Sequence, residues 1–173
     1  MLSMAILGLL LEQPLHGYEI RIRLHKLLGI NGLISFGSLY PILSTLHRQG
    51  YVSVEIITPE ISPNTKPKLS ERKKRKVYTI TEEGRQAFQE KLTLSIAKNA
   101  TDDRAFVAHL AFIEHAKDKD SEILISHRER ALRDRLDLIP TTNNLILKRW
   151  HELEANYIRD QINFLDSLKE KEK

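Results

Sequence analysis

Apolar residues recur at helical spacing through the first part of the chain, and breaks divide the pattern into three segments. Residues 2–11 are almost continuously apolar and predict a short buried helix. Pro14 and Gly17 end that pattern, and a second apolar stripe follows over residues 17–28. A third stripe covers residues 36–49, after the break "GINGL". Three short helices joined by tight breaks are typical of a helix-turn-helix unit.

The period then changes to two, which indicates β-strands. Residues 51–57 ("YVSVEII") and 76–80 ("KVYTI") alternate and are rich in β-branched residues. Pro59, Pro63 and Pro67 lie between these two runs and exclude a helix there. The pattern therefore predicts a long β-hairpin.

The rest of the chain has helical spacing. One helix is expected to begin after Thr81, and another after an N-cap supplied by Asp102 or Asp103. A further helix is expected from Ser121, and a long one from about residue 143 to near the C-terminus.

The long last helix carries more apolar surface than one small domain needs. Residues spaced four, three, four and seven apart form a heptad-like seam, namely Ile146, Trp150, Leu153, Tyr157 and Phe164. A second row, of Leu147, Ile158, Ile162 and Leu165, widens this face. Such a face needs a partner from the same chain or from another subunit, and we expect the seam to form a homodimer. Trp150 is expected to pack in the core or dimer, with the wall of an effector pocket as the alternative.

The order of elements predicts a fold class that is mainly α with a small two-stranded β wing. A winged helix-turn-helix domain is expected over residues 1–92, followed by a C-terminal helical dimerisation region over residues 93–173.

The third predicted helix has an ordinary inner face and an unusual outer face. Leu39, Ile42, Leu43 and Leu46 fall within about 60° of one another on a helical wheel and form the core face. Small, hydrogen-bonding or basic residues occupy the helix start and its other side: Ser35, Gly37, Ser38, Tyr40, Pro41, Ser44, Thr45 and Arg48. Pro41 is tolerated because a helix beginning at Gly37 or Ser38 places it near the start. A slim helix start with unpaired N–H donors suits the DNA major groove, although an ordinary surface helix is the alternative.

The net charge of the chain is only +4, but it is unevenly distributed. Between Thr58 and Lys76 there are seven bases and two acids, and the bases are Lys66, Lys68, Arg72, Lys73, Lys74, Arg75 and Lys76. By itself such a run fits either a solvated loop or an arm that binds a polyanion. Its place at the tip of a hairpin beside the third helix favours double-stranded DNA, because the wing of a winged helix reaches neighbouring phosphates.

Several classes of protein are disfavoured by composition and motifs. Cysteine is absent, which excludes disulfides and thiolate chemistry and fits a reducing compartment. The run "MAILGLLLE" is too short to span a bilayer, and no base precedes Arg21, so we expect a cytoplasmic protein without a membrane partner. His109 and His115 lie about 240° apart on a helix and cannot share an ion. We find no nucleophile elbow, phosphate loop or zinc spacing, and we therefore expect no catalytic residue, no metal, no cofactor and no enzyme.

Three stretches together resemble the PadR-type transcriptional regulators: "LGLLLEQPLHGYEI", "GSLYPILSTLHRQGYV" and "RKVYTITEEGRQAF". The resemblance covers roughly the first ninety residues of the chain. It implies a winged-helix repressor that dimerises through C-terminal helices and often releases DNA when a small effector binds. It also suggests that Tyr18 contacts a phosphate; packing of a half-buried Tyr18 on the first helix is the alternative.

The expected function is a sequence-specific, DNA-binding transcriptional regulator. We expect a repressor that binds a palindromic operator as a homodimer, and a small-molecule effector is a further partner that the resemblance suggests. The alternative is a winged-helix protein-interaction module without DNA binding. A neutral or acidic hairpin would have supported that alternative, and this hairpin is basic.

Overall fold

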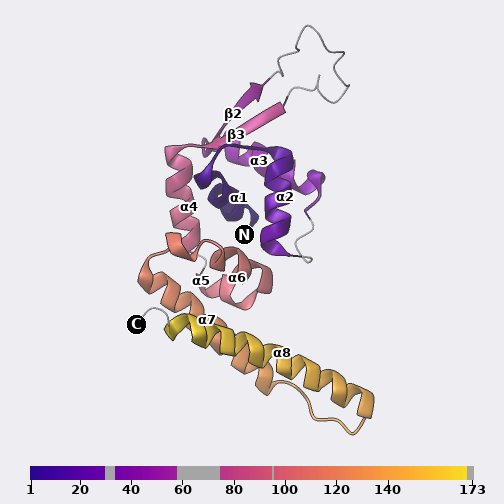
Figure 1. The fold of residues 1–173 in the computed structure, drawn as a ribbon. Coiled ribbons are helices and arrows are strands. Elements are labelled where there is room, and N and C mark those ends of the chain that lie inside the picture. Colours follow the sequence, from indigo (N-terminus) through magenta and orange to yellow (C-terminus); the bar gives the residue numbers. More distant parts are fainter. Residues whose placement is uncertain (30–33, 58–74, 95, 171–173) are drawn as a thin grey trace.

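The computed structural model describes residues 1–29, 34–57, 75–94 and 96–170, with the backbone alone described at 97–99 and 170. Its elements in chain order are α1 (Leu2–Glu12), β1 (Leu15–His16), α2 (Gly17–Leu28), α3 (Phe36–Arg48), β2 (Val52–Ile57), β3 (Arg75–Ile80), α4 (Glu82–Leu94), α5 (Ile96–Thr101), α6 (Asp103–Leu110), the 3₁₀ turn η2 (Ile113–His115), α7 (Asp118–Asp137) and α8 (Leu145–Glu170). The β2–β3 hairpin projects from one end of the molecule and the antiparallel α7–α8 pair from the other (Figure 1).

The predicted fold class is confirmed, with one more strand than the sequence indicated. β3 lies in the middle of an antiparallel sheet of order β1-β3-β2. β1 consists only of Leu15 and His16, which lie opposite Tyr78 and Val77. Two residues cannot display a period, and the flanking Pro14 and Gly17 indicate a break, so the pattern gave no sign of this strand.

A first hydrophobic core fills the space among α1, α2, α3, α4 and the sheet. α1 lies in the middle of this group, and its residues Met4–Leu10 are all buried (Figure 1). α3 contributes Leu39, Leu43 and Leu46, each at most 1% exposed. These three leucines fix the rotation of α3 about its axis, so the opposite face must point to solvent.

A second core lies among α5, α6, α7 and α8 and is organised around a buried cation. Arg128 of α7 is 3% exposed. Its guanidinium donates to the Ala100 carbonyl oxygen at 3.1 Å, to Asp103 Oδ1 at 2.6 Å and to Gln161 Oε1 at 2.7 Å. It also lies 4.9 Å from the centroid of the Phe106 ring. Because these partners come from α5, α6 and α8, one side chain connects all four helices of this core.

The two cores are joined by the segment that follows α6. Phe112 is buried in the first core, and a Cβ added at Gly8 would lie 2.6 Å from its ring. The glycine in α1 therefore provides the space for Phe112. The predicted domain boundary after residue 92 falls inside α4 and stays a prediction.

Helix starts left open by the sequence are settled by side-chain caps. Asp102 is the N-cap of α6, because its Oδ1 accepts from the Ala105 N–H at 2.7 Å. Asp103 pairs with the buried arginine instead. Thr81 Oγ1 accepts from the Gly84 N–H at 3.0 Å, as predicted for the start of α4.

Candidate nucleic-acid interface

The start of α3 is held by a pair of serines. Ser35 is the N-cap, and its Oγ accepts from the Ser38 N–H at 3.1 Å and lies 3.0 Å from Ser38 Oγ. The N–H groups of Ser38 and Leu39 also donate to the Ser35 carbonyl oxygen, at 3.1 and 3.0 Å. Two N–H donors that the sequence suggested were unpaired are therefore bonded within the chain, and the Ser35 and Ser38 hydroxyls lie beside them.

Pro41 is the sixth residue of α3 and not part of its first turn, because the helix begins at Phe36. Proline has no N–H to donate to the carbonyl of Gly37, four residues earlier, and its ring crowds that carbonyl. Gly37 and Pro41 are both exposed, which leaves this side of the helix low in bulk. Thr45 Oγ1 donates to the Pro41 carbonyl oxygen at 2.9 Å, so its hydroxyl is directed along its own helix.

The outer face of α3 lies in solvent as the wheel predicted. Six of the predicted contact residues on this helix are exposed, namely Gly37, Ser38, Tyr40, Pro41, Ser44 and Arg48, and Thr45 is half-buried. Ser35, just before the helix, is exposed as well. A face of small hydroxyls with one phenol and one guanidinium can hydrogen-bond to base edges and phosphates.

Tyr18 does not pack as a half-buried residue on α1. Its side chain is 57% exposed, and its ring stacks on Phe36 with centroids 6.3 Å apart. Phe36 stacks in turn on Tyr40 at 5.9 Å, and the Arg21 guanidinium lies 4.4 Å from the centroid of Phe36. The starts of α2 and α3 thus share one aromatic surface.

Phe36 and Arg21 were not singled out from the sequence. A wheel places Phe36 about 60° from Leu39, at the edge of the core face, where an aromatic residue is normally buried. Arg21 entered the sequence argument only as the first basic residue of the chain. The signal that could have found them is the recurrence of aromatic residues at positions 36 and 40, four apart on one helix.

The base of the wing lies beside α3. Of the seven predicted wing cations, Arg75 and Lys76 are described and both are exposed. Lys66, Lys68, Arg72, Lys73 and Lys74 lie outside the described residues. Lys76 lines a cleft of about 530 Å³ with Tyr40 and Ser44 of α3. One wing cation and two predicted α3 contacts therefore face the same space.

This cleft is partly apolar, and a hydrogen bond ties α3 to the sheet beside it. It is lined by Leu43, Val54, Ile56 and Tyr78 in addition to the polar residues. His47 Nδ1 donates to the Val52 carbonyl oxygen at 3.0 Å, which ties the end of α3 to β2. Burial raises the pKa of the Tyr78 hydroxyl, with a smaller contribution from Tyr40, so Tyr78 stays neutral at physiological pH.

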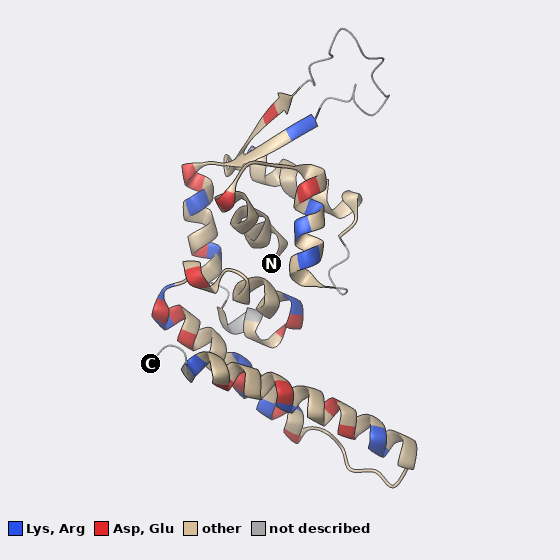
Figure 2. Cartoon of the chain, viewed as in Figure 1, with Lys and Arg blue, Asp and Glu red and all other residues tan. Residues whose placement is uncertain are grey.

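Charge is distributed differently along α2 and along the C-terminal helices. After a red start, blue residues follow one another along α2, and blue marks the start of β3, whereas blue and red alternate along α7 and α8 (Figure 2). Acid–base pairs such as Arg135–Glu154, at 3.1 Å, account for part of that alternation. The side with α2 and the wing is therefore the one suited to a polyanion.

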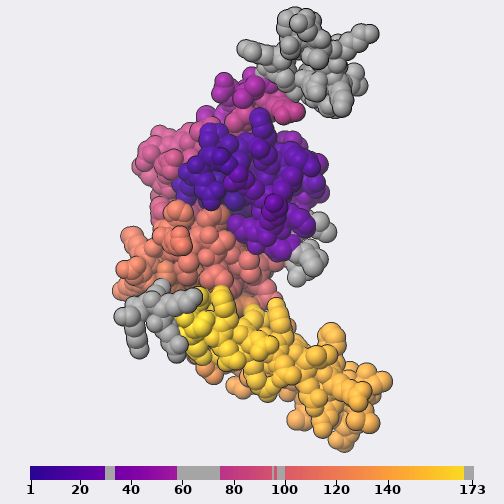
Figure 3. All heavy atoms as spheres, in the orientation of Figure 1, coloured from indigo at the N-terminus to yellow at the C-terminus, as the bar shows by residue number. Residues whose placement is uncertain are grey.

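α8 presents the predicted seam to solvent. Its five residues, Ile146, Trp150, Leu153, Tyr157 and Phe164, are between 47% and 80% exposed. Ile158, Ile162 and Leu165 of the second row are instead buried in the second core, while Leu147 is exposed. On a wheel the seam and the buried row are about 120° apart, so the seam points away from its own chain. In Figure 3, α8 lies on the surface along its length.

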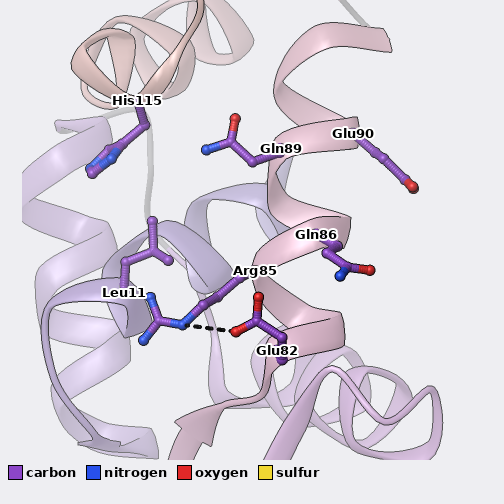
Figure 4. A pocket seen from close by; sticks show the side chains of 7 residues that line it. All are labelled: Leu11, Glu82, Arg85, Gln86, Gln89, Glu90 and His115. Atoms are coloured by element: carbon purple, nitrogen blue, oxygen red, sulfur yellow. Dashed lines mark ion pairs between the residues drawn. The ribbon is translucent and has the colours of Figure 1, made fainter.

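A separate groove of about 660 Å³ runs between α4, the end of α1 and His115. In Figure 4, Arg85 and Gln89 extend toward Leu11 and His115, and Arg85 Nε lies 4.0 Å from Glu82 Oε2. The groove contains both signs of charge and none of the predicted DNA contacts. It shares no lining residue with the cleft beside α3.

Side chains that could suggest chemistry have structural partners. His109 is buried, and its ring nitrogens lie 3.0 Å from the Leu92 and 3.3 Å from the Ala105 carbonyl oxygens. Burial lowers its pKa, which favours the neutral ring. His115 packs against Phe88, with centroids 5.9 Å apart. Within the described ranges no three His, Asp or Glu side chains gather as metal ligands would.

None of the helices described is both long and apolar enough to cross a bilayer.

Comparison with known proteins gives one family and several structures. Residues 6–90 match the model of the family described as "Transcriptional regulator PadR-like family". No curated protein matches the chain. A transcriptional regulator from Thermoplasma acidophilum is 26% identical, with a TM-score of 0.45, over 59% of this chain and 87% of that one.

Two structures of Bacillus subtilis PadR are similar over most of the chain. The complex of that protein with operator DNA is 18% identical, with a TM-score of 0.43, over 96% of this chain and 94% of the other. The complex with p-coumaric acid is also 18% identical, with a TM-score of 0.41, over 96% and 95% of the two chains.

Proposed function

Through residues 6–90 the chain belongs to the PadR-like family of transcriptional regulators, and we propose that it is a repressor that binds a palindromic operator as a homodimer. One observation carries the proposal: α3 buries three leucines and turns a row of hydroxyls, a phenol and a guanidinium outward beside the wing. A helix held in this way by its own core can enter a groove without rearranging.

Specificity is assigned to the middle of α3. Tyr40 and Ser44 are exposed one turn apart and line the same cleft as Lys76. We propose that these two side chains reach base edges, while the wing cations, Arg48 and Tyr18 bind phosphates. Phosphate contacts supply affinity and register, and base contacts supply sequence preference.

The dimer is assigned to the seam of α8. An exposed row of isoleucine, tryptophan, leucine, tyrosine and phenylalanine on one side of a helix is typical of an interaction surface. A second copy of α8 suits it, because the spacing allows two helices to interlock. A two-fold axis would repeat α3 on one side of the duplex, with half-sites one helical turn apart or a multiple of it.

Release by a small effector completes the proposal. A groove of about 540 Å³ lies between α8 and the segment that follows α7, and it is lined by Ile139, Lys148, His151, Asn156 and Arg159 among others. Its size and mixture of apolar and polar groups suit a small molecule. A ligand there would change how α8 is held, and thereby the spacing of the two α3 helices.

The test is selection of bound sequences from random duplex DNA by the purified protein. We expect a palindrome whose two halves are recovered together and are separated by about ten base pairs or a multiple of that distance. Recovery of no consensus, at salt concentrations where non-specific binding is weak, would contradict the proposal and favour a protein-interaction module.

A further inference from the structure

Phe36 is the central ring of an exposed array of three aromatic side chains. Its ring plane is inclined by 22° to that of Tyr18 and by 19° to that of Tyr40, so the three rings are nearly parallel. Phe36 is itself 40% exposed. A phenyl ring has no hydrogen-bonding group and gains nothing from contact with water. Its place on this surface is better explained by what it does to its neighbours.

Phe36 also holds a cation. The guanidinium carbon of Arg21 lies 4.4 Å from the centroid of Phe36 and 6.0 Å from that of Tyr18. Arg21 Nε is buried without a hydrogen-bond partner, and no carboxylate of the described residues pairs with Arg21. Stacking therefore sets the position of this guanidinium, and no neighbouring acid neutralises its charge.

Tyr40 is restrained from a second direction by Gly17, the first residue of α2. A Cβ added at position 17 would lie 3.2 Å from both Cε1 and the hydroxyl oxygen of Tyr40. These distances are tighter than ordinary van der Waals contact, so Tyr40 would have to move if residue 17 had a side chain. Tyr18 follows Gly17 directly, so the first turn of α2 carries the Tyr18 phenol and also lies against the Tyr40 phenol.

We infer that Phe36 is a positioning residue for the DNA interface, which holds Tyr18, Tyr40 and Arg21 in the orientation that a DNA strand requires. The inference rests on the proposed function, since it concerns how that site is organised. Phe36 contributes no polar contact of its own. It acts by presenting two phenol hydroxyls and one guanidinium together to adjacent phosphates and the base edge beside them.

The physical reason is preorganisation. An exposed tyrosine or arginine otherwise samples several rotamers and loses that freedom when it binds. Stacking already restricts these rotamers in the free protein. Less conformational entropy is therefore lost on binding, and more of the free energy of each hydrogen bond contributes to affinity. Removal of the central ring should then weaken three interactions with DNA at once.

The experiment compares Phe36→Leu with Phe36→Tyr, using the operator recovered by selection. Leucine keeps an apolar side chain at the start of α3 but cannot stack, whereas tyrosine keeps the ring. We expect Phe36→Leu to weaken operator binding about tenfold, the change expected when two or three stacking interactions of ordinary strength are removed. Phe36→Tyr should remain within about twofold of the wild type.

The same substitution is then made in a Tyr18→Phe/Tyr40→Phe background, which retains the rings and removes both hydroxyls. Because Phe36 acts mainly through those hydroxyls, Phe36→Leu should have a smaller effect there, about threefold or less. A structural role would give the same factor in both backgrounds and would overturn the inference. Equal binding by the wild type and Phe36→Leu would also overturn it and leave the proposed function intact. Failure of the wild type to select any operator would overturn the proposed function itself.

Gly17→Ala provides a second variant that leaves Phe36 unchanged and is used if Phe36→Leu does not fold. It should displace Tyr40 and weaken operator binding about threefold, and the effect should disappear in a Tyr40→Phe background. The inference fails if Gly17→Ala binds as the wild type does, or if its effect persists without the Tyr40 hydroxyl. Thermal unfolding followed by circular dichroism accompanies each variant.

Discussion

α3 and α8 both bury one row of aliphatic residues and expose another, yet their exposed rows differ in kind. α3 exposes hydroxyls, a phenol and a guanidinium around a slim start, whereas α8 exposes five large apolar or aromatic residues in a heptad-like row. The buried rows account for the packing of each helix, and both consist of leucine or isoleucine side chains. The exposed rows are therefore the ones that specify partners: a polar, charged one for α3 and a second hydrophobic helix for α8.

The largest loss of operator binding should follow from making the exposed seam of α8 polar, as the outer face of α3 is. Trp150→Glu combined with Leu153→Glu places two carboxylates in the seam, and burying each one unpaired would cost several kcal/mol. We expect a monomer in sedimentation and loss of tight operator binding. Circular dichroism should show that the protein remains folded, because the seam is outside both cores.

The matched control adds two carboxylates elsewhere on α8. Asn163→Glu combined with Ser167→Glu changes exposed positions that belong neither to the seam nor to the groove proposed for the effector. This variant should remain dimeric and bind the operator. A monomeric seam variant that binds the full operator as tightly as the wild type would contradict the link between the two helices.

A smaller, more selective effect is expected from the outer row of α3. Tyr40→Ala or Ser44→Ala should reduce operator affinity by about 1–3 kcal/mol, the usual value of one specific base contact. Non-specific binding should change much less, since phosphates hold the rest of the interface. Competition between operator and random duplex measures the ratio, and an unchanged ratio in a folded variant would remove these residues from base readout.

The smallest effect should come from the base of the wing. Arg75→Ala combined with Lys76→Ala should weaken binding to every duplex by a similar factor. The slope of log affinity against log salt should fall by about 0.9 for each phosphate that a subunit no longer neutralises. A slope equal to that of the wild type would show that these two cations are merely solvated.

Most of the fold followed from periodicity because long stripes of apolar residues leave few alternatives. The core face of α3, the Thr81 cap and the exposed position of the α8 seam all agree with the pattern. The two-residue strand β1 and the short helix α5 were missed, since neither is long enough to show a period. α7 begins at Asp118, before the predicted start at Ser121. The first residues of this helix are polar, so the apolar stripe begins after the helical backbone does.

The candidate site was less predictable than the fold. Sequence placed the polar outer residues of α3 correctly in solvent, but it could not show that Phe36 bridges Tyr18 and Tyr40. That bridge joins residues of two helices, and its geometry depends on how α2 packs against α3. Gly17 is a similar case, since its approach to Tyr40 exists only after the helices have packed.

Sedimentation of the wild type with operator duplexes tests the central claim most directly, because it tests both exposed rows together. One duplex carries both half-sites of the selected palindrome, and a second carries one half-site with the other scrambled. The account predicts a dimer without DNA, two chains bound on the complete operator, and a marked loss of affinity on the half-operator. A monomer that binds either duplex with one chain and equal affinity would contradict it.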